Sequence, residues 1–260
     1  MQGIELWEGD CLDLMDDIPD KSINMILCDL PYGMTAFSWD IIIPFELLWN
    51  QYNRIITDNG AILLFSSQPF TSMLLMSNQK MFKYELIWNK LHGTDFQLAN
   101  KKPMKSHENI LVFGKHTLTY NKQTTLRNHS IDTTNWKQDK RNKDHNNFSS
   151  KSNMRKVYKE KNPTTVIDYS LSNAECNNTK RLHPTQKPVK LLEYLIKTYT
   201  NEQEIVLDNC MGSGSTGIAC LNLERKFIGI EKNERYFQIA KNRIENHIII
   251  KNINNDIEFF

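Results

Sequence analysis

The sequence lacks the features that mark disulfide-rich, zinc-binding, membrane and secreted proteins. Its five cysteines are an odd number and include no Cys-x-x-Cys pair, which argues against a disulfide framework and against a zinc site. The longest apolar runs are the length of a strand, far too short to span a bilayer. The N-terminus has no basic region followed by an apolar stretch, so no signal peptide is expected. These absences predict a cytoplasmic protein with reduced thiols, no metal and no membrane contact.

Length and composition allow one sizeable core and a smaller insertion. The chain has 260 residues, of which 40% are hydrophobic and 24% charged, as in ordinary soluble domains. The formal net charge of +2 conceals an asymmetry. Residues 115–181 contain 14 Lys and Arg against 6 Asp and Glu, a net +8, so the rest of the chain carries −6. Attraction to phosphates is therefore expected to concentrate in the middle of the chain.

Short apolar runs separated by helix-length segments predict an open α/β sheet with helices on both faces. Seven strands are expected, at residues 4–7, 23–28, 61–65, 84–88, 110–113, 205–207 and 227–230. Apolar side chains at helical spacing predict helices at residues 45–56, 188–199 and 236–248. The sequence Asp58-Asn-Gly60 is expected to end the first of these helices.

Residues 116–181 interrupt this pattern. They are rich in Asn, Lys, Thr and Ser and have few apolar runs, so no secondary structure is assigned to them. One interpretation is a solvated, disordered linker. Basic residues alternate with rings such as Tyr120, Trp136 and Tyr158, however, and this favours an insertion that contacts nucleic acid. The flanking residues 1–115 and 182–260 are then two halves of one domain.

The sequence Asp29-Leu30-Pro31-Tyr32 follows the second apolar run directly. An exocyclic amine of a nucleic-acid base is a poor nucleophile because its lone pair is delocalised into the ring. The Asp29 carboxylate and the Leu30 carbonyl would accept both amine hydrogens and aim the lone pair at an electrophile. Pro31 would fix the turn and Tyr32 would stack on the base. Alignment and electrostatic preorganisation would then carry the catalysis. The alternative is an ordinary proline turn at a strand end.

A glycine-rich loop follows the sixth apolar run. Asp208 ends the run, and Gly212 and Gly214 precede a helix-forming segment. Glycines remove Cβ atoms where a ligand must lie against main-chain amides. Glu231, at the end of the next run, is suited to the two hydroxyls of a ribose. The pattern favours a nucleotide-like cofactor, although a tight strand–helix turn with a solvated glutamate is the alternative. The loop lacks the lysine of a P-loop, which disfavours ATP hydrolysis.

Together these motifs resemble those of the amino-group DNA methyltransferases that use S-adenosylmethionine. In that family the catalytic motif reads Asp/Asn/Ser-Pro-Pro-Tyr and the cofactor motif contains Phe-x-Gly-x-Gly. The sequence His183-Pro-Thr-Gln-Lys187-Pro188 resembles the family's leading cofactor-site motif, and Gly9-Asp10 resembles the segment whose acid contacts the cofactor adenine. Residues 107–113 resemble a late strand motif of the catalytic half. The order of the motifs is similar to that of the permuted beta group.

The resemblance implies a seven-stranded Rossmann-like methyltransferase sheet with a circularly permuted motif order and a basic insertion. Residues 1–115 would form the catalytic half, residues 116–181 a target-recognition insertion and residues 182–260 the cofactor-binding half. The implied catalytic residues are Asp29, Leu30, Pro31 and Tyr32. The implied contacts to S-adenosylmethionine are Asp10, Asp29, Lys187, Asp208, Gly212, Gly214, Ser215 and Glu231.

The sequence departs from the family pattern at two places. Leu30 replaces the first proline, although the role expected there belongs to a backbone carbonyl. Cys210-Met211 stands in the loop that usually bears an aromatic ring, and Met211 is a candidate to cover the cofactor instead. Because position 29 is an aspartate rather than a serine or asparagine, the resemblance favours adenine N6 over cytosine N4 or a glutamine amide as the target. The main rival is a methyltransferase that acts on RNA or on a protein amide. A third interpretation is a catalytically silent DNA-binding relative, and the intact Asp29, Tyr32 and loop glycines argue against it.

The implied substrate is double-stranded DNA, whose target base must flip out of the duplex to reach such a pocket. Phe37 and Trp39 are candidates to line the site around that base. A cytoplasmic, nucleoid-associated enzyme of a restriction–modification system is expected. The sequence leaves open whether it forms a homodimer and whether it has a partner endonuclease.

Overall fold

The computed structural model describes residues 3–34, 40–132, 157–170 and 186–257. The chain divides into two compact units, one made of Met1–Asn121 with Thr165–Phe260 and the other of Lys122–Thr164. The smaller unit lies inside the segment that the sequence predicted as an insertion. Its boundaries are narrower than the predicted 116–181, because residues on both sides of it belong to the larger unit.

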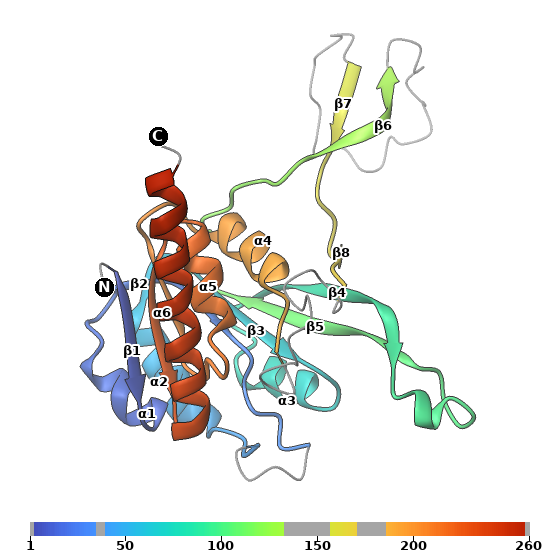
Figure 1. Cartoon of the computed structure of the whole chain (residues 1–260). Helices are drawn as coiled ribbons and strands as arrows, with labels where there is room; N and C mark the ends of the chain where they lie inside the picture. The colour runs from blue at the N-terminus through green and yellow to red at the C-terminus, as the bar shows by residue number, and fades with distance from the viewer. Residues whose placement is uncertain (1–2, 35–39, 133–156, 171–185, 258–260) are drawn as a thin grey trace. The chain divides into compact units, whose positions relative to one another are not determined.

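The larger unit is built on a sheet of eight strands in the order β1-β10-β9-β2-β3-β5-β4-β8 (Figure 1). The strands from β1 to β3 in this order are parallel, β5 is antiparallel to both β3 and β4, and β8 is parallel to β4. The strands are β1 (Ile4–Glu8), β2 (Ile23–Cys28), β3 (Ile56–Ser66), β4 (Phe82–Thr94), β5 (Lys105–Phe113), β8 (Val166–Asp168), β9 (Ile205–Asp208) and β10 (Lys226–Glu231).

All seven expected strands are present, which confirms the predicted α/β methyltransferase-like sheet. The eighth, β8, was missed because it has only three residues, of which only Ile167 is buried. So short a segment shows no periodicity. Pairing with β4 nevertheless makes it part of the main sheet.

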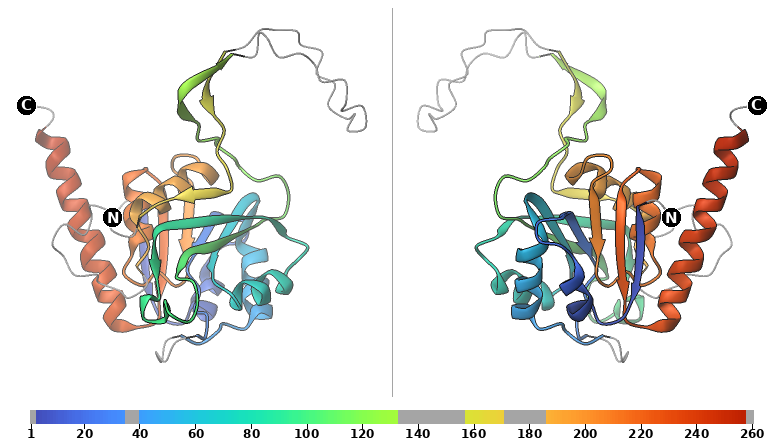
Figure 2. Two further views of the ribbon diagram at one scale, coloured as in Figure 1. Left: turned by 90° about the vertical axis from the view of Figure 1, so that its right-hand side faces the viewer. Right: turned by 90° about the vertical axis from the view of Figure 1, so that its left-hand side faces the viewer.

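Helices cover both faces of the sheet (Figure 2). Alternate residues of β2 point to opposite sides, so Leu27 packs with α4, α5 and α6, whereas Ile26 packs with α1, α2 and α3. The helices are α1 (Cys11–Leu14), α2 (Phe45–Ile55), α3 (Phe70–Ser77), α4 (Val189–Tyr199), α5 (Ser215–Asn222) and α6 (Glu234–Ile257), with 3-10 turns η1 (Met15–Asp17) and η2 (Phe96–Leu98). None of the helices described here is both long and apolar enough to cross a membrane.

The expected turn at residues 58–60 is wrong. Helix α2 ends at Ile55, and β3 begins at Ile56 and runs straight through the polar residues. Because Ile56 pairs with Ile23 of β2, strand β3 begins before the apolar residues 61–65 that predicted it. Sheet pairing therefore overrides the local turn signal, as tertiary context often does.

The smaller unit contains two antiparallel strands, β6 (Thr125–Asp132) and β7 (Val157–Lys161). No secondary structure was assigned to these residues from the sequence. The described side chains of this ribbon are largely exposed, including Leu126 and Tyr158. Because the strands bury little, they leave no apolar periodicity for a sequence pattern to reveal.

Candidate active site

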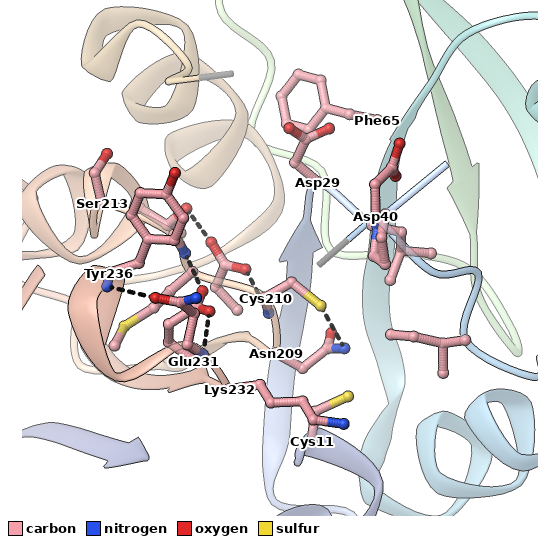
Figure 3. Close-up of a pocket in the computed structure, with 18 of the residues that line it drawn as sticks. Cys11, Asp29, Asp40, Phe65, Asn209, Cys210, Ser213, Glu231, Lys232 and Tyr236 are labelled. Carbon is pink, nitrogen blue, oxygen red and sulfur yellow. Dashed lines mark hydrogen bonds between the residues drawn. The ribbon is translucent and has the colours of Figure 1, made fainter. Parts of the chain in front are cut away.

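A cavity of about 480 Å³ lies at the carboxyl ends of four parallel strands, β1, β2, β9 and β10 (Figure 3). Carboxyl ends of parallel strands meet at one edge of a sheet, where α/β proteins commonly bind ligands. The volume is in the range of small-molecule and cofactor sites. The predicted site residues that line it are Asp10, Asp29, Leu30, Pro31, Tyr32, Lys187, Asp208, Gly212, Ser215 and Glu231.

Asp208 holds together the loop that follows β9. Its carboxylate is buried and accepts hydrogen bonds from the Thr216 hydroxyl at 2.6 Å and from the Cys210 backbone N–H at 3.2 Å. Burial raises the pKa of Asp208 to about 7, because these neutral donors only partly offset the loss of water. The side chain thus ties the end of β9 to the first turn of α5.

The two loop glycines serve different purposes. Gly212 has φ 52° and Gly214 has φ 76°, conformations that other residues adopt at a cost. A Cβ on Gly214 would lie 3.1 Å from the Cβ of Ala240, so this glycine lets α5 approach α6. Gly214 is the one predicted site residue that does not line the cavity. Gly212 lines it, and its N–H donates to the Glu231 Oε2 at 2.9 Å.

Glu231 stands at the end of β10 with both carboxylate oxygens fixed by the backbone. Besides the bond from Gly212, its Oε1 accepts from the Asn233 N–H at 2.8 Å. Burial raises the pKa of Glu231. Each carboxylate oxygen can accept more than one hydrogen bond, so the group retains capacity for a ligand. Its geometry is set before any ligand arrives.

Asp10 links the loops that follow β1 and β10. It caps α1 by accepting from the Leu12 N–H at 2.9 Å, and it pairs with the Lys232 Nζ at 2.9 Å. The hydrogen bond from Lys232 is the main reason that the pKa of Asp10 is lowered. Asp10 therefore reaches the cavity rim as a carboxylate beside an exposed ammonium group.

Ser215, at the start of α5, is held by a residue that the sequence did not single out. Its hydroxyl accepts from the Arg243 guanidinium at 2.8 Å, and the same guanidinium nitrogen donates to the Ser213 carbonyl at 3.0 Å. Arg243 lies 28 residues further along the chain from Ser215, on α6. No local motif marks such a partner.

The catalytic-motif residues lie directly after β2. The Asp29 Oδ1 accepts from the Tyr32 hydroxyl at 2.7 Å, and its Oδ2 pairs with the Lys187 Nζ at 2.5 Å. Leu30 is 4% exposed and packs in the core, which anchors its backbone carbonyl. Both oxygens of Asp29 are thus oriented, one by a neutral donor and one by a cation.

Lys187 joins Asp29 to a second buried acid, Glu108 on β5. The Lys187 Nζ lies 3.4 Å from the Glu108 Oε2, and Glu108 pairs with Lys90 at 2.6 Å. Burial alone would lower the pKa of Lys187, but the two carboxylates outweigh it and the pKa is raised. For Glu108 burial is likewise outweighed, by the lysines, and its pKa is lowered. The sequence identified Lys187 and the strand motif that contains Glu108, but it gave no role to Glu108 and did not mark Lys90.

Tyr32 is held by a turn that Asp40 closes. The Asp40 carboxylate accepts from the N–H groups of Gly33 at 2.8 Å and Met34 at 2.9 Å. The Tyr32 ring stacks on Phe70, with centroids 4.9 Å apart and planes at 25°. Burial raises the pKa of the Tyr32 hydroxyl, which therefore remains a donor to Asp29 at neutral pH. Asp40 was not predicted, and the candidate rings Phe37 and Trp39 lie outside the described residues.

Cys210 and Met211, which depart from the family pattern in the cofactor loop, pack closely beside the cavity. Met211 lines the cavity and its sulfur occupies the space above Gly229, so that a Cβ on this glycine would lie 2.4 Å away. Cys210 lies against the thiols of Cys11 and Cys28. Burial raises the pKa of Cys28 to about 12, which makes this thiol inert at neutral pH. Cys28 thus behaves as buried filler.

Comparison with known proteins agrees with this arrangement. The family described as DNA methylase, N6_N4_Mtase, matches residues 23–242. The Type II methyltransferase M.HpaI of Haemophilus parainfluenzae is 26% identical over 89% of this chain and 71% of its own. M1.MboII of Moraxella bovis is 28% identical over 91% of this chain and 94% of its own. The DNA adenine methyltransferase YhdJ of Escherichia coli is 26% identical over 91% of this chain and 81% of its own.

Solved structures show the same likeness. The complex of M1.HpyAVI with SAM aligns with a TM-score of 0.62 and 26% identity over 93% of this chain and 98% of that one. The cytosine-N4-specific PvuII methyltransferase aligns with a TM-score of 0.66 over 97% of this chain and 92% of that one. At 16% identity it supports the fold alone. The resemblance predicted from the sequence is confirmed: the chain belongs to the N6/N4 DNA methylase family.

Proposed function

We propose that this protein transfers a methyl group from S-adenosylmethionine to the exocyclic N6 of a flipped adenine in double-stranded DNA. The observation that carries the proposal is that Asp29-Leu30-Pro31-Tyr32 and the loop of Gly212 and Glu231 line one cavity. The relative YhdJ is named a DNA adenine methyltransferase, and the similar M1.HpyAVI has been crystallised with SAM. Cytosine N4 is the alternative target, and the relatives do not support it better than adenine N6.

The residues around the cavity fit S-adenosylmethionine. Glu231 has acceptor capacity for the ribose hydroxyls, and Asp10 stands where the family places the acid near the cofactor adenine. Gly212 leaves room for a ligand against the backbone, whereas Asp208 acts by shaping the loop. When bound, the cofactor supplies an electrophilic methyl group. Direct contacts from Ser215 and Lys187 stay predictions, since both side chains already have protein partners.

The chain's own contribution to the reaction is alignment of the target amine. The amine would donate its two hydrogens to the Asp29 carboxylate and the Leu30 carbonyl, which directs the nitrogen lone pair toward the cofactor. Lys187 and Tyr32 hold the carboxylate in one orientation before DNA binds. Such preorganisation stabilises the transition state without reorganising the site at the moment of reaction. No strong base is needed, because the amine can lose its proton after transfer.

The recognition of a DNA sequence is assigned to the basic insertion. The structure narrows the segment that can be removed to test this. Deleting all of residues 117–179 would remove β8 and the Tyr169 carbonyl that accepts from the Trp88 indole at 2.8 Å. Replacing only 122–164 with a short Gly-Ser linker keeps the sheet whole. This variant should bind S-adenosylmethionine normally but lose sequence-specific DNA binding and its steep salt dependence.

The setting of the reaction is proposed from the relatives. Several are named Type II methyltransferases, which supports a restriction–modification role with a partner endonuclease. Action on genomic DNA would place the protein at the nucleoid, in the cytoplasm. A homodimer stays a prediction that sedimentation of the purified protein tests.

One experiment tests the proposed reaction. The protein is expressed in a bacterial host that lacks adenine methylation, and the host DNA is read by single-molecule sequencing. We expect N6-methyladenine at one sequence context. N4-methylcytosine would assign the alternative target. If DNA remains unmodified while purified protein labels RNA or protein with radioactive S-adenosylmethionine, the DNA assignment is wrong. The Asp29→Ala variant, expressed to the same level, is the control for host background.

A further inference from the structure

The connection between β4 and β5 is a long hairpin with an apolar tip. It extends away from the body of the sheet (Figure 1). Phe96, on the short turn η2, is 74% exposed. Other exposed apolar side chains of residues 91–104 are Leu91, Leu98 and Met104. An exposed cluster of large apolar side chains on a projecting element marks an interaction surface.

The hairpin leaves the sheet at the same edge as the catalytic motif. Strand β3 is parallel to β2, β5 is antiparallel to β3, and β4 is antiparallel to β5. Strand β4 therefore runs in the direction of β2, and its carboxyl end lies at the edge where Asp29 follows β2. A flipped base that reaches Asp29 must leave its duplex at this edge. The duplex and the hairpin are thus on the same side of the enzyme.

The charge of the hairpin suits DNA. Its tip bears Lys101 and Lys102, both exposed, with Asp95 as the one acid among residues 91–105. Asp95 is paired with Lys102 at 3.1 Å. At the base, Lys90 pairs with Glu108, which also contacts Lys187 beside Asp29. The base of the hairpin is therefore tied to the catalytic site by buried ion pairs.

The tip holds Phe96 outward through local bonds. The Leu98 N–H donates to the Asp95 carbonyl at 2.8 Å, and the Thr94 hydroxyl donates to the Lys105 carbonyl at 2.9 Å. Asp95 has φ 64° and Leu91 has φ 63°, a left-handed conformation that is uncommon for residues other than glycine and that clusters at functional sites. These bonds and backbone conformations fix the main chain that presents the exposed ring.

We propose that residues 91–104 contact duplex DNA and that Phe96 enters the base stack beside the flipped adenine. Proteins that distort duplexes commonly insert an apolar side chain between base steps, which offsets part of the cost of unstacking. Lys101 and Lys102 contact the flanking phosphates. The inference rests on the proposed function. Asp29 and its neighbours receive the flipped base, and Phe96 would promote its flipping.

The test compares Phe96→Ala with wild type and with Leu47→Ala, a truncation of a similarly apolar, 51% exposed side chain on α2. The substrate is a duplex containing the methylated sequence found by sequencing, with 2-aminopurine at the target adenine to report flipping by fluorescence. Single-turnover methylation is measured on the same duplex with adenine. A stacking contact contributes about 1–3 kcal/mol, so Phe96→Ala should lose on the order of tenfold or more in flipping and in rate. Leu47→Ala should match wild type.

A second substrate distinguishes insertion of Phe96 into the base stack from a general loss of enzyme activity. When the base opposite the target is replaced by an abasic site, flipping costs less. Phe96→Ala should then recover most of its rate, and Phe96→Trp should retain activity on both substrates. Wild-type rates for Phe96→Ala on the paired duplex, or an equal loss on both substrates, would overturn the inference. So would a change of oligomeric state in Phe96→Ala with normal flipping, which would identify a protein interface. If wild type methylates no DNA at all, the proposed function itself fails.

Discussion

The two sides of the cavity hold their buried acids in opposite ways. On the cofactor side, the donors to Asp208 and Glu231 among the described residues are neutral hydroxyl, thiol and backbone groups, and burial raises the pKa of both. On the catalytic side, Asp29 and Glu108 are paired with lysines. Neutral donors orient a carboxylate but only partly offset the loss of water on burial, whereas a nearby cation favours the charged form more strongly. The cofactor side thus provides geometry, and the catalytic side provides charge in a fixed position.

The largest effect is expected from removing the acid of the catalytic side. Asp29→Ala takes away the acceptor for the target amine and leaves Lys187 with Glu108 as its one remaining carboxylate contact among the described residues. Methyl transfer should fall on the order of 100-fold or more. Cofactor affinity should fall much less. Single-turnover methylation and calorimetric titration with S-adenosylmethionine measure the two, and near-wild-type turnover would contradict the mechanism.

Glu231→Ala tests the cofactor side in the same assays. The variant removes the carboxylate that orders the Gly212 N–H and the proposed acceptor for ribose. Affinity for S-adenosylmethionine should fall on the order of 10- to 100-fold, since charge-assisted hydrogen bonds contribute about 1.5–3 kcal/mol each. DNA affinity should change little. Equal losses of both affinities would mean that the variant is misfolded or that the cofactor lies elsewhere.

Glu108→Gln tests whether the lysine network supports catalysis through charge. The ion pair of Lys187 is present below its raised pKa and lost as the pH rises through it. Removing the Glu108 charge lowers that pKa, so the alkaline limit of the methylation rate should move to lower pH, with a few-fold loss at neutrality. Rates measured from about pH 7 to about pH 11, a range that includes the ordinary lysine pKa of about 10.4, test this. The matched control is Glu46→Gln, on the exposed face of α2. An unshifted profile would assign Glu108 a packing role alone.

The smallest effect is a difference in the pH dependence of stability. Burial raises the pKa of Asp208 from 3.8 to about 7. Its contribution to the folding stability is therefore fully present below pH 3.8 and is lost as the pH rises through about 7. Asp208→Asn cannot ionise. The melting temperature of wild type should therefore fall relative to the variant across this window, on the order of 5 °C. Parallel pH dependences of the two melting temperatures would show that folding does not raise the pKa of Asp208.

Several features of this protein follow from the sequence alone. Seven apolar runs of strand length predict seven strands, because burial on both faces of a parallel sheet demands continuous apolar residues. The two motifs around Asp29 and Gly212 are short and contiguous, so their chemistry is visible without a structure. Their meeting in one cavity also follows, because both come at carboxyl ends of parallel strands.

Only the tertiary structure decided which groups hold these motifs in place. Lys187 meets Asp29 across 158 positions, and Glu108 and Lys90 complete the network from neighbouring strands. Arg243 reaches Ser215 from another helix, and β8 joins the sheet with a single buried residue. Periodicity records whether a side chain is buried, but not which distant side chain it meets there. Pairing between polar groups far apart in the chain is set by the packing of the elements, and so it emerges only when the sheet is assembled.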